Sequence, residues 1–283
     1  MPPSSITTLW FEGPLLAAPT RHLLKHTGSS LETLILKEIS TDIYEVLVRT
    51  PLPRLAHLEQ PYIKGTPKHD HFASFTTIRV LIISSMGPLS VPLTALPQLT
   101  YLSAPHTVAM VLLPGRPVRT YRMSFNYTYR GGTYVTTPLR ETAPYAKHIE
   151  ELQLSTTFPP ARLAGLLSTL LPKIVRVRLM MDEFELPAAA EAPTEPEHVH
   201  RSLREFDIGF SVVEGQPFPR KDCQKVLTAL TKVCPALEVV RFGRLFPVEG
   251  GGVDERDVPL DRLMDMRQTA EGKWEEKKWG KHI

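Results

Sequence analysis

The chain has 283 residues, enough for one or two ordinary domains, and its content of 42% hydrophobic and 22% charged residues is typical of a globular protein. A formal net charge of +3 and only two cysteines exclude a strongly basic nucleic-acid-binding protein and a disulfide-stapled secreted domain. The N-terminal sequence lacks the pattern of a secretory signal, and no apolar run approaches the roughly 18 residues that a membrane span needs. We therefore expect a cytoplasmic or nuclear protein that binds neither nucleic acid nor a membrane.

One spacing of residues, apolar-x-x-apolar-x-apolar, recurs from the N-terminus to about residue 242. Successive copies begin 19 to 34 residues apart. A weaker copy, Leu55-Leu58-Gln60, fills the long gap near the start. The other copies are Ile6-Leu9-Phe11, Leu31-Leu34-Leu36, Ile78-Leu81-Ile83, Leu99-Leu102-Ala104, Val118-Tyr121-Met123, Ile149-Leu152-Leu154, Ile174-Val177-Leu179, Leu203-Phe206-Ile208 and Leu237-Val240-Phe242.

Each copy predicts a short strand, because the copies are dense in aliphatic and β-branched residues. Helices are expected between some of the strands, where capping residues or prolines precede apolar residues at helical spacing. These helices are expected after Ser40-Thr41-Asp42, after Pro159-Pro160 and from Asp222 to the residue before Pro235. The two shortest steps between copies, of 21 and 19 residues, have room only for a turn or a loop, and Pro114-Gly115-Arg116-Pro117 predicts a tight turn between a short helix and the strand at Val118.

A period of about 20–29 residues built on this spacing is the signature of a leucine-rich-repeat solenoid. Strands joined through helices or loops on one side lie parallel and adjacent in one sheet. The predicted fold class is therefore α/β, an irregular leucine-rich-repeat solenoid with a curved parallel sheet and helices or loops on the outer face. We expect the solenoid to span residues 1–247.

Three segments depart from the repeat. Residues 124–148 form a Tyr/Thr/Gly-rich insert that predicts a hairpin-like excursion, and residues 187–200 are rich in Pro and Glu and predict a mobile loop. Residues 248–283 form a charged C-terminal tail containing Trp274 and Trp279. Because the end of a solenoid must cover its core, we expect this tail to act as a cap.

Residues at equal positions in successive copies should lie side by side in a parallel sheet. One such row reads Thr120, Glu151, Arg176, Glu205, Val239, and the next reads Arg122, Gln153, Arg178, Asp207, Arg241. Opposite charges fall next to each other, as cross-strand pairing favours. In the earlier copies these rows are neutral or apolar. The residues predicted to form an exposed, partner-binding strand face are Tyr101, Arg122, Arg176, Arg178, Glu205, Asp207 and Arg241.

No set of residues predicts catalysis, a cofactor or a metal site. His69-Asp70-His71 and Glu197-His198-Val199-His200 have ligand-like spacing, but no third ligand cluster accompanies them. Cys223 and Cys234 have no histidine placed beside them and are expected to be buried small side chains. We therefore expect a protein that is not an enzyme and has no cofactor. The alternative is an enzyme with an irregular α/β core and an unrecognised active site.

The stretch from Leu102-Ser103-Ala104-Pro105 to Leu113-Pro114-Gly115-Arg116-Pro117-Val118, together with the closing Gly272-Lys273-Trp274 and Trp279, resembles fungal F-box-type leucine-rich-repeat proteins of mushroom-forming fungi. In that family an F-box binds the Skp adaptor of an SCF ubiquitin ligase, and the repeats recruit the protein to be ubiquitylated. The resemblance implies a non-catalytic protein-interaction module that takes part in substrate recognition.

Two departures from that family concern the start of the chain and the turns. The first copy begins at Ile6, so we expect no F-box in this chain, no Skp-type adaptor among its partners and an unknown protein partner instead. The regular asparagine of standard repeats is also missing, so the turns after the strands are expected to be held by other groups.

Overall fold

A computed structural model describes residues 6–11, 16–37, 39–64, 72–85, 90–124, 135–182, 199–211, 218–245 and 261–277. The chain separates into two compact units, the first comprising Met1–Asn126 with Pro144–His148 and the second Tyr127–Ala143 with Ile149–Ile283. The strands belong to an open, mostly parallel sheet, so the fold is mixed α/β, as predicted.

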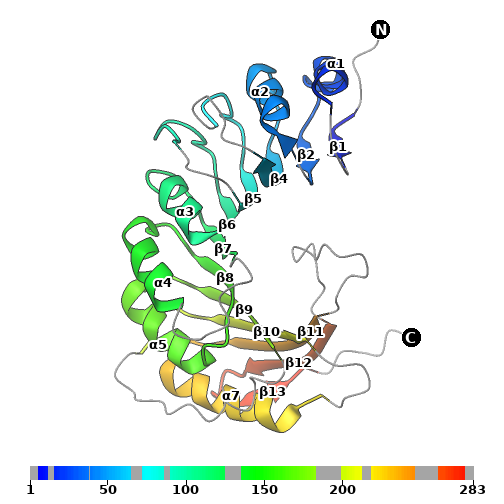
Figure 1. The fold of residues 1–283 in the computed structure, drawn as a ribbon. Helices are drawn as coiled ribbons and strands as arrows, with labels where there is room; N and C mark the ends of the chain where they lie inside the picture. Colours follow the sequence, from blue (N-terminus) through cyan, green and yellow to red (C-terminus); the bar gives the residue numbers. More distant parts are fainter. Residues whose placement is uncertain are drawn as a thin grey trace, which may run out of the picture. The chain divides into compact units, whose positions relative to one another are not determined.

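The first unit contains six strands that run parallel in chain order (Figure 1). The central apolar residue of each copy lies opposite the central apolar residue of the next, as with Leu34 between Leu9 and Leu58. A two-residue strand, β3 (Ile39–Ser40), pairs with β4 outside this order. The six strands are β1 (Thr8–Phe11), β2 (Thr33–Leu36), β4 (His57–Lys64), β5 (Val80–Ser85), β6 (Tyr101–Ala104) and β7 (Thr120–Met123).

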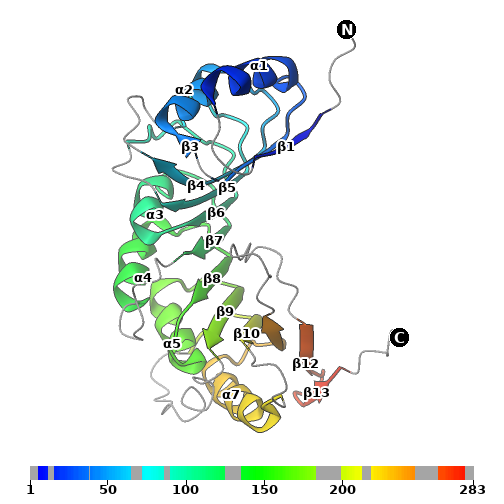
Figure 2. The same ribbon diagram turned by 45° about the vertical axis from the view of Figure 1, so that its right-hand side comes forward.

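Helices α1 (Ala17–Thr27), α2 (Thr41–Arg49) and α3 (His106–Leu112) lie on one face of these strands (Figure 2). Helix α2 begins where the sequence predicts, because the Ser40 hydroxyl accepts a hydrogen bond from the Ile43 N–H at 3.5 Å. The core lies between the helices and the strands, with Leu34, Leu58 and Leu81 fully buried.

The second unit has four parallel strands followed by two antiparallel ones. The parallel strands are β8 (Glu151–Ser155), β9 (Arg176–Asp182), β10 (Glu205–Ser211) and β11 (Val239–Leu245). The antiparallel strands are β12 (Asp261–Gln268) and β13 (Trp274–Glu276), so the C-terminal segment continues the sheet next to the last repeat strand.

Helices α5 (Pro160–Leu170) and α7 (Arg220–Val233) lie between strands in sequence, close to where the sequence predicts them. The sequence does not predict α4 (Thr136–Thr142), which lies in the insert of residues 124–148 and leads into a short 3-10 helix, η2 (Ala143–Tyr145). The hairpin expected in that insert, most of the loop at 187–200 and the expected tail boundary at residue 248 lie outside the described residues.

One hydrogen-bonding pattern recurs in both units. Within each unit, the carbonyl just after the first apolar residue of a copy accepts two N–H groups of the next copy in that unit. The Thr7 carbonyl accepts from Glu32 and Thr33 at 2.8 and 2.9 Å, and the Glu150 carbonyl accepts from Val175 and Arg176 at 2.8 and 3.0 Å. The backbone hydrogen bonds at the start of the strand are therefore the same in copies whose connections differ in length.

Arg116 holds two neighbouring turns of the first unit together. Its side chain is 3% exposed and lies next to the C-terminal end of α3, where free helix carbonyls favour a cation. Burial lowers the pKa of its guanidinium group. The guanidinium donates hydrogen bonds of 2.8 to 3.3 Å to the backbone carbonyls of Pro92, Ala95, Val111, Leu112 and Pro114.

Candidate functional site

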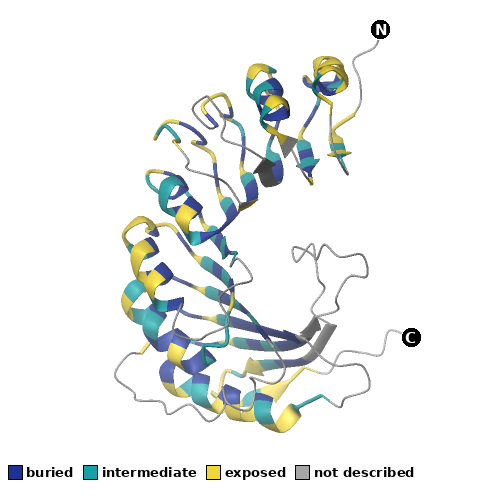
Figure 3. Ribbon diagram, viewed as in Figure 1, coloured by how far each residue is buried: buried dark blue, intermediate teal, exposed yellow. Residues whose placement is uncertain are grey.

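The candidate site lies on the strand face of the second unit, which we define as the sheet face opposite helices α5 and α7 (Figure 3). Leu152, Val177, Phe206 and Val240 are fully buried on the helix side. Because side chains alternate along a strand, the residues on either side of these four point to the strand face.

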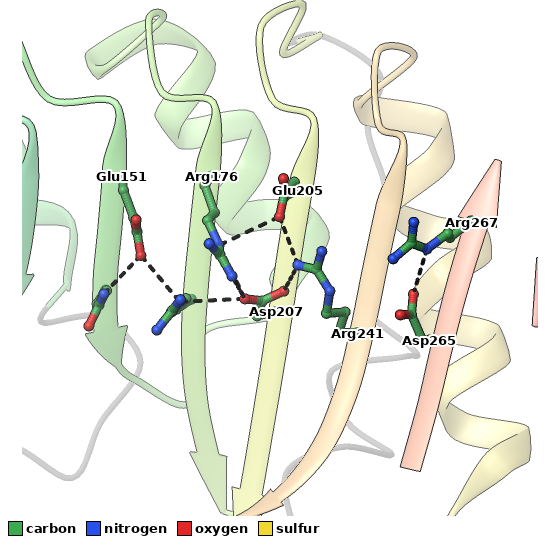
Figure 4. Close-up of polar contacts among 9 residues, drawn as sticks. Glu151, Arg176, Glu205, Asp207, Arg241, Asp265 and Arg267 are labelled. Atoms are coloured by element: carbon green, nitrogen blue, oxygen red, sulfur yellow. Dashed lines mark hydrogen bonds and ion pairs between the residues drawn. The ribbon is translucent and has the colours of Figure 1, made fainter. Parts of the chain in front are cut away.

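Nine polar side chains gather on the strand face, which we call the strand-face cluster: seven are linked through ion pairs and hydrogen bonds, and Asp265 and Arg267 form a separate pair beside them (Figure 4). The register agrees with the rows expected from the sequence, with Arg176 opposite both Glu151 and Glu205, and Asp207 opposite Arg178. The cluster consists of Glu151 and Gln153 on β8, Arg176 and Arg178 on β9, Glu205 and Asp207 on β10, Arg241 on β11, and Asp265 and Arg267 on β12.

Asp207 lies at the centre of the strand-face cluster. Its Oδ2 is 2.6 Å from Arg176 Nη2 and 3.5 Å from Arg178 Nε, and its Oδ1 is 2.8 Å from Arg241 Nη1. The side chain is only 2% exposed, so the expectation that Asp207 is exposed is wrong. Arginines on both neighbouring strands cover it and supply the charge that a buried carboxylate requires.

Glu205 also links Arg176 and Arg241, and its side chain is more exposed than that of Asp207. Its Oε2 is 2.7 Å from Arg241 Nη1 and 3.7 Å from Arg176 Nε. Burial acts to lower the pKa of Arg241, but its hydrogen bonds to Glu205 and Asp207 and their negative charges outweigh burial and raise it. Arg241 therefore stays a cation and acts as a fixed hydrogen-bond donor.

The cluster continues on β8 and β12. Glu151 accepts from Gln153 at 2.8 Å and lies 3.2 Å from Arg178 Nε. Asp265 lies opposite Arg241, is fully buried, and its Oδ1 is 3.5 Å from Arg267 Nε. Asp265 and Arg267 were not predicted from the sequence, because β12 lies outside the repeat. The alternation Met264-Asp265-Met266-Arg267 is the signal that could have found this strand.

The charges of the strand-face cluster balance, because four arginines (176, 178, 241 and 267) face four carboxylates (151, 205, 207 and 265). A balanced set does not create the positive field that attracts phosphates. Its exposed parts are the side chains of Arg267 at 45%, Arg178 at 38% and Glu205 at 34%. The arrangement therefore presents donors and acceptors in fixed positions to another molecule.

The remaining two predicted face residues lie in the first unit. Tyr101 lies opposite Val80 and Thr120, and Arg122 lies opposite Ser103, and both are half-buried. Ser103 is buried at 5% exposure. These two residues belong to the strand rows of their own unit and are not part of the strand-face cluster.

The other candidate residues have structural surroundings. His200 is 1% exposed, donates its N–H to the Val233 carbonyl and accepts from the Leu203 N–H, so it is not part of a solvated loop. Burial raises the pKa of Cys223 and that of Cys234 to about 12. His69-Asp70-His71 and residues 197–198, which have ligand-like spacing but were not predicted to bind a metal, lie outside the described residues. Within the described ranges, no group of three or more His, Cys, Asp or Glu side chains is placed to hold a metal ion.

No helix in the described part of the chain is both long and apolar enough to cross a membrane. Compared with protein-family models and with curated proteins, the chain matches none of them.

Proposed function

We propose that the chain is a non-catalytic protein-interaction module, built as an irregular leucine-rich-repeat solenoid with a curved parallel sheet. The parallel register of the copies and the recurring pair of backbone hydrogen bonds support this proposal. By its resemblance to fungal F-box-type repeat proteins, it recruits a protein substrate, as the repeat domain of an SCF-type ubiquitin ligase does. Its site of action is the cytoplasm or the nucleus.

The observation that carries the proposal is the order of the strand-face cluster. Buried Asp207 fixes Arg176 and Arg241, and the exposed Arg178 is held between Glu151 and Asp207. Side chains held in place before binding lose little conformational entropy when a partner docks. A polar partner surface with complementary donors and acceptors fits such a face better than an apolar or uniformly acidic one.

The partner-binding residues of this proposal are those predicted from the sequence, with Asp207 acting from beneath the surface. The cluster supplies Arg176, Arg178, Glu205, Asp207 and Arg241, and the first unit supplies Tyr101 and Arg122 on its own strands.

A capture experiment with matched variants tests the proposal. In this experiment, tagged protein captures its partners from a native extract. The variant R178Q/R267Q removes the two most exposed charges of the cluster. The control R162Q/K221Q removes two exposed charges from helices α5 and α7. We expect the first variant to lose at least about tenfold of the captured protein, and the control to retain it. Equal capture by both variants, with both folded by circular dichroism, contradicts binding through the strand face.

A further inference from the structure

The outer edge of strand β1 has no partner strand among the described residues, and it is independent of the strand-face cluster. On its other side, strand β1 pairs with β2. The Thr7 carbonyl accepts from Glu32 and Thr33, and the Phe11 carbonyl accepts from Lys37 at 3.2 Å. Backbone groups alternate in direction along a strand, so the N–H and C=O groups of Thr8 and Trp10 point away from β2.

Apolar side chains surround these outward backbone groups. Trp10 is 61% exposed, and Leu9 and Phe11 are half-buried, whereas the equivalent Leu34 and Leu36 of β2 are fully buried. Among the described residues, the core of the first unit is therefore less completely covered at β1 than at β2. Another strand added to this edge would bury Leu9 and Phe11 in the same way as β1 and β4 bury the residues of β2.

The other end strand, β13, shows what a protected edge looks like in this chain. It has three residues, two of which are the exposed Glu275 and Glu276, and Arg220 of α7 binds Glu276 at 2.9 Å. Short, charged edge strands resist pairing with other chains. Strand β1 has the opposite character, because Thr8-Leu9-Trp10-Phe11 carries no charge.

Among the described residues around β1, basic side chains outnumber the acidic one, Glu32, whose backbone N–H bonds to the Thr7 carbonyl. Helix α1, which follows β1, contains Arg21 and Lys25 and no acidic residue, and both side chains are exposed. The Lys37 ammonium lies 5.4 Å over the Trp10 ring. Two copies joined through β1 would bring these like charges together, whereas an acidic strand would meet them favourably.

From these observations we propose that β1 is a docking edge for an extended, acidic peptide segment of a partner protein, which adds to the sheet as a further strand. Its apolar residues pack beside Leu9 and Phe11. Its acidic residues point to the side of Trp10 and Lys37.

Binding of the peptide acetyl-Val-Glu-Val-Glu-Val-Glu-Val-amide, measured by fluorescence anisotropy of a labelled form, tests this proposal. The variant T8P removes one outward N–H without removing a bond to β2, and T8A removes the same side chain but keeps that N–H. We expect T8P to weaken binding at least about tenfold and T8A to leave it nearly unchanged. Replacing Glu by Lys in the peptide should abolish binding, and K37E should weaken binding of the Glu peptide.

N-methylated peptides test the backbone pairing itself. Because only alternate N–H groups of an added strand point to β1, methylation of either all Glu or all Val residues should abolish binding, while the other series binds normally. The proposal is overturned if the Glu peptide does not bind, if T8P binds as well as T8A, or if both methylated series bind equally. It is also overturned if sedimentation shows a dimer of the chain that T8P dissociates, because the occupant of the edge is then a second copy.

Discussion

Replacing Asp207 by asparagine is the sharpest test of how the strand-face cluster is built. Asp207→Asn keeps the size of the side chain and removes the charge that faces Arg176, Arg178 and Arg241. Hydrogen bonds to charged groups contribute about 1.5–3 kcal/mol each, and breaking a buried ion pair costs about 3–5 kcal/mol. Arg176 and Arg178 are 27% and 38% exposed and can turn toward water, which reduces the loss. We therefore expect the free energy of unfolding to fall by about 3 kcal/mol.

Urea denaturation followed by circular dichroism measures this change, with Glu151→Gln as the matched control. Glu151 lies at the margin of the cluster and is 21% exposed, so the same change of carboxylate to amide should cost about 1 kcal/mol or less. The double variant Asp207→Asn/Arg241→Met removes one of the uncompensated cations, and we expect it to lose less than the sum of the two single losses. A loss at Asp207 of under about 1 kcal/mol, or one equal to that of Glu151→Gln, would refute the reasoning.

Four further predictions concern single buried groups. Gln60 occupies a core position, and both of its amide atoms are buried with no hydrogen-bond partner among the described residues. Gln60→Leu should therefore raise the free energy of unfolding by about 1–3 kcal/mol in urea titrations. A decrease in the free energy of unfolding contradicts this prediction. Arg116→Met leaves five carbonyls without their donor and should lower the free energy of unfolding by about 2–4 kcal/mol, whereas no loss would show that Arg116 does not hold the turns. Burial lowers the pKa of His200, against a smaller opposing effect of the Leu171 backbone, so its contribution to stability is complete above pH of about 6.5 and is lost as the pH falls below that value. Wild type should then lose more stability than His200→Asn between pH 7.5 and 5, and equal losses contradict this. Because burial raises the pKa of Cys223 and of Cys234 to about 12, both thiols should resist alkylation at pH 8 until urea unfolds the chain, and fast native labelling would be inconsistent with their burial.

The parallel register was predictable because the side chains that set it are apolar and recur at one spacing. A shift of one residue would turn Val177 and Phe206 to the strand face, so the apolar pattern alone fixes which charges lie side by side. The neighbours of Arg176 and Arg178 on the adjacent strands could therefore be predicted from the positions of residues within each copy. Even the weak copy with Gln60 in its third apolar position forms a full strand, β4, because Leu58 aligns with Leu34 and Leu81.

What the sequence did not reveal depends on contacts between distant segments. The burial of Asp207 needs arginines on two neighbouring strands, and its own position in β10 is that of an exposed residue. The role of Arg116 depends on where five carbonyls from two connections meet, which no local pattern records. Strand β12 was missed because it runs antiparallel and lies outside the repeat, so the search for the repeat could not detect it.

Site-specific photo-crosslinking tests the central claim, that the strand face of the second unit binds a partner protein. A photoreactive amino acid is placed at Arg178 on the strand face or at Arg162 on the exposed side of α5, and the adducts formed in native extract are identified by mass spectrometry. The account predicts that one protein species is crosslinked from position 178 and is absent from position 162. The same adducts from both positions, or none from position 178 with the protein folded, would contradict it.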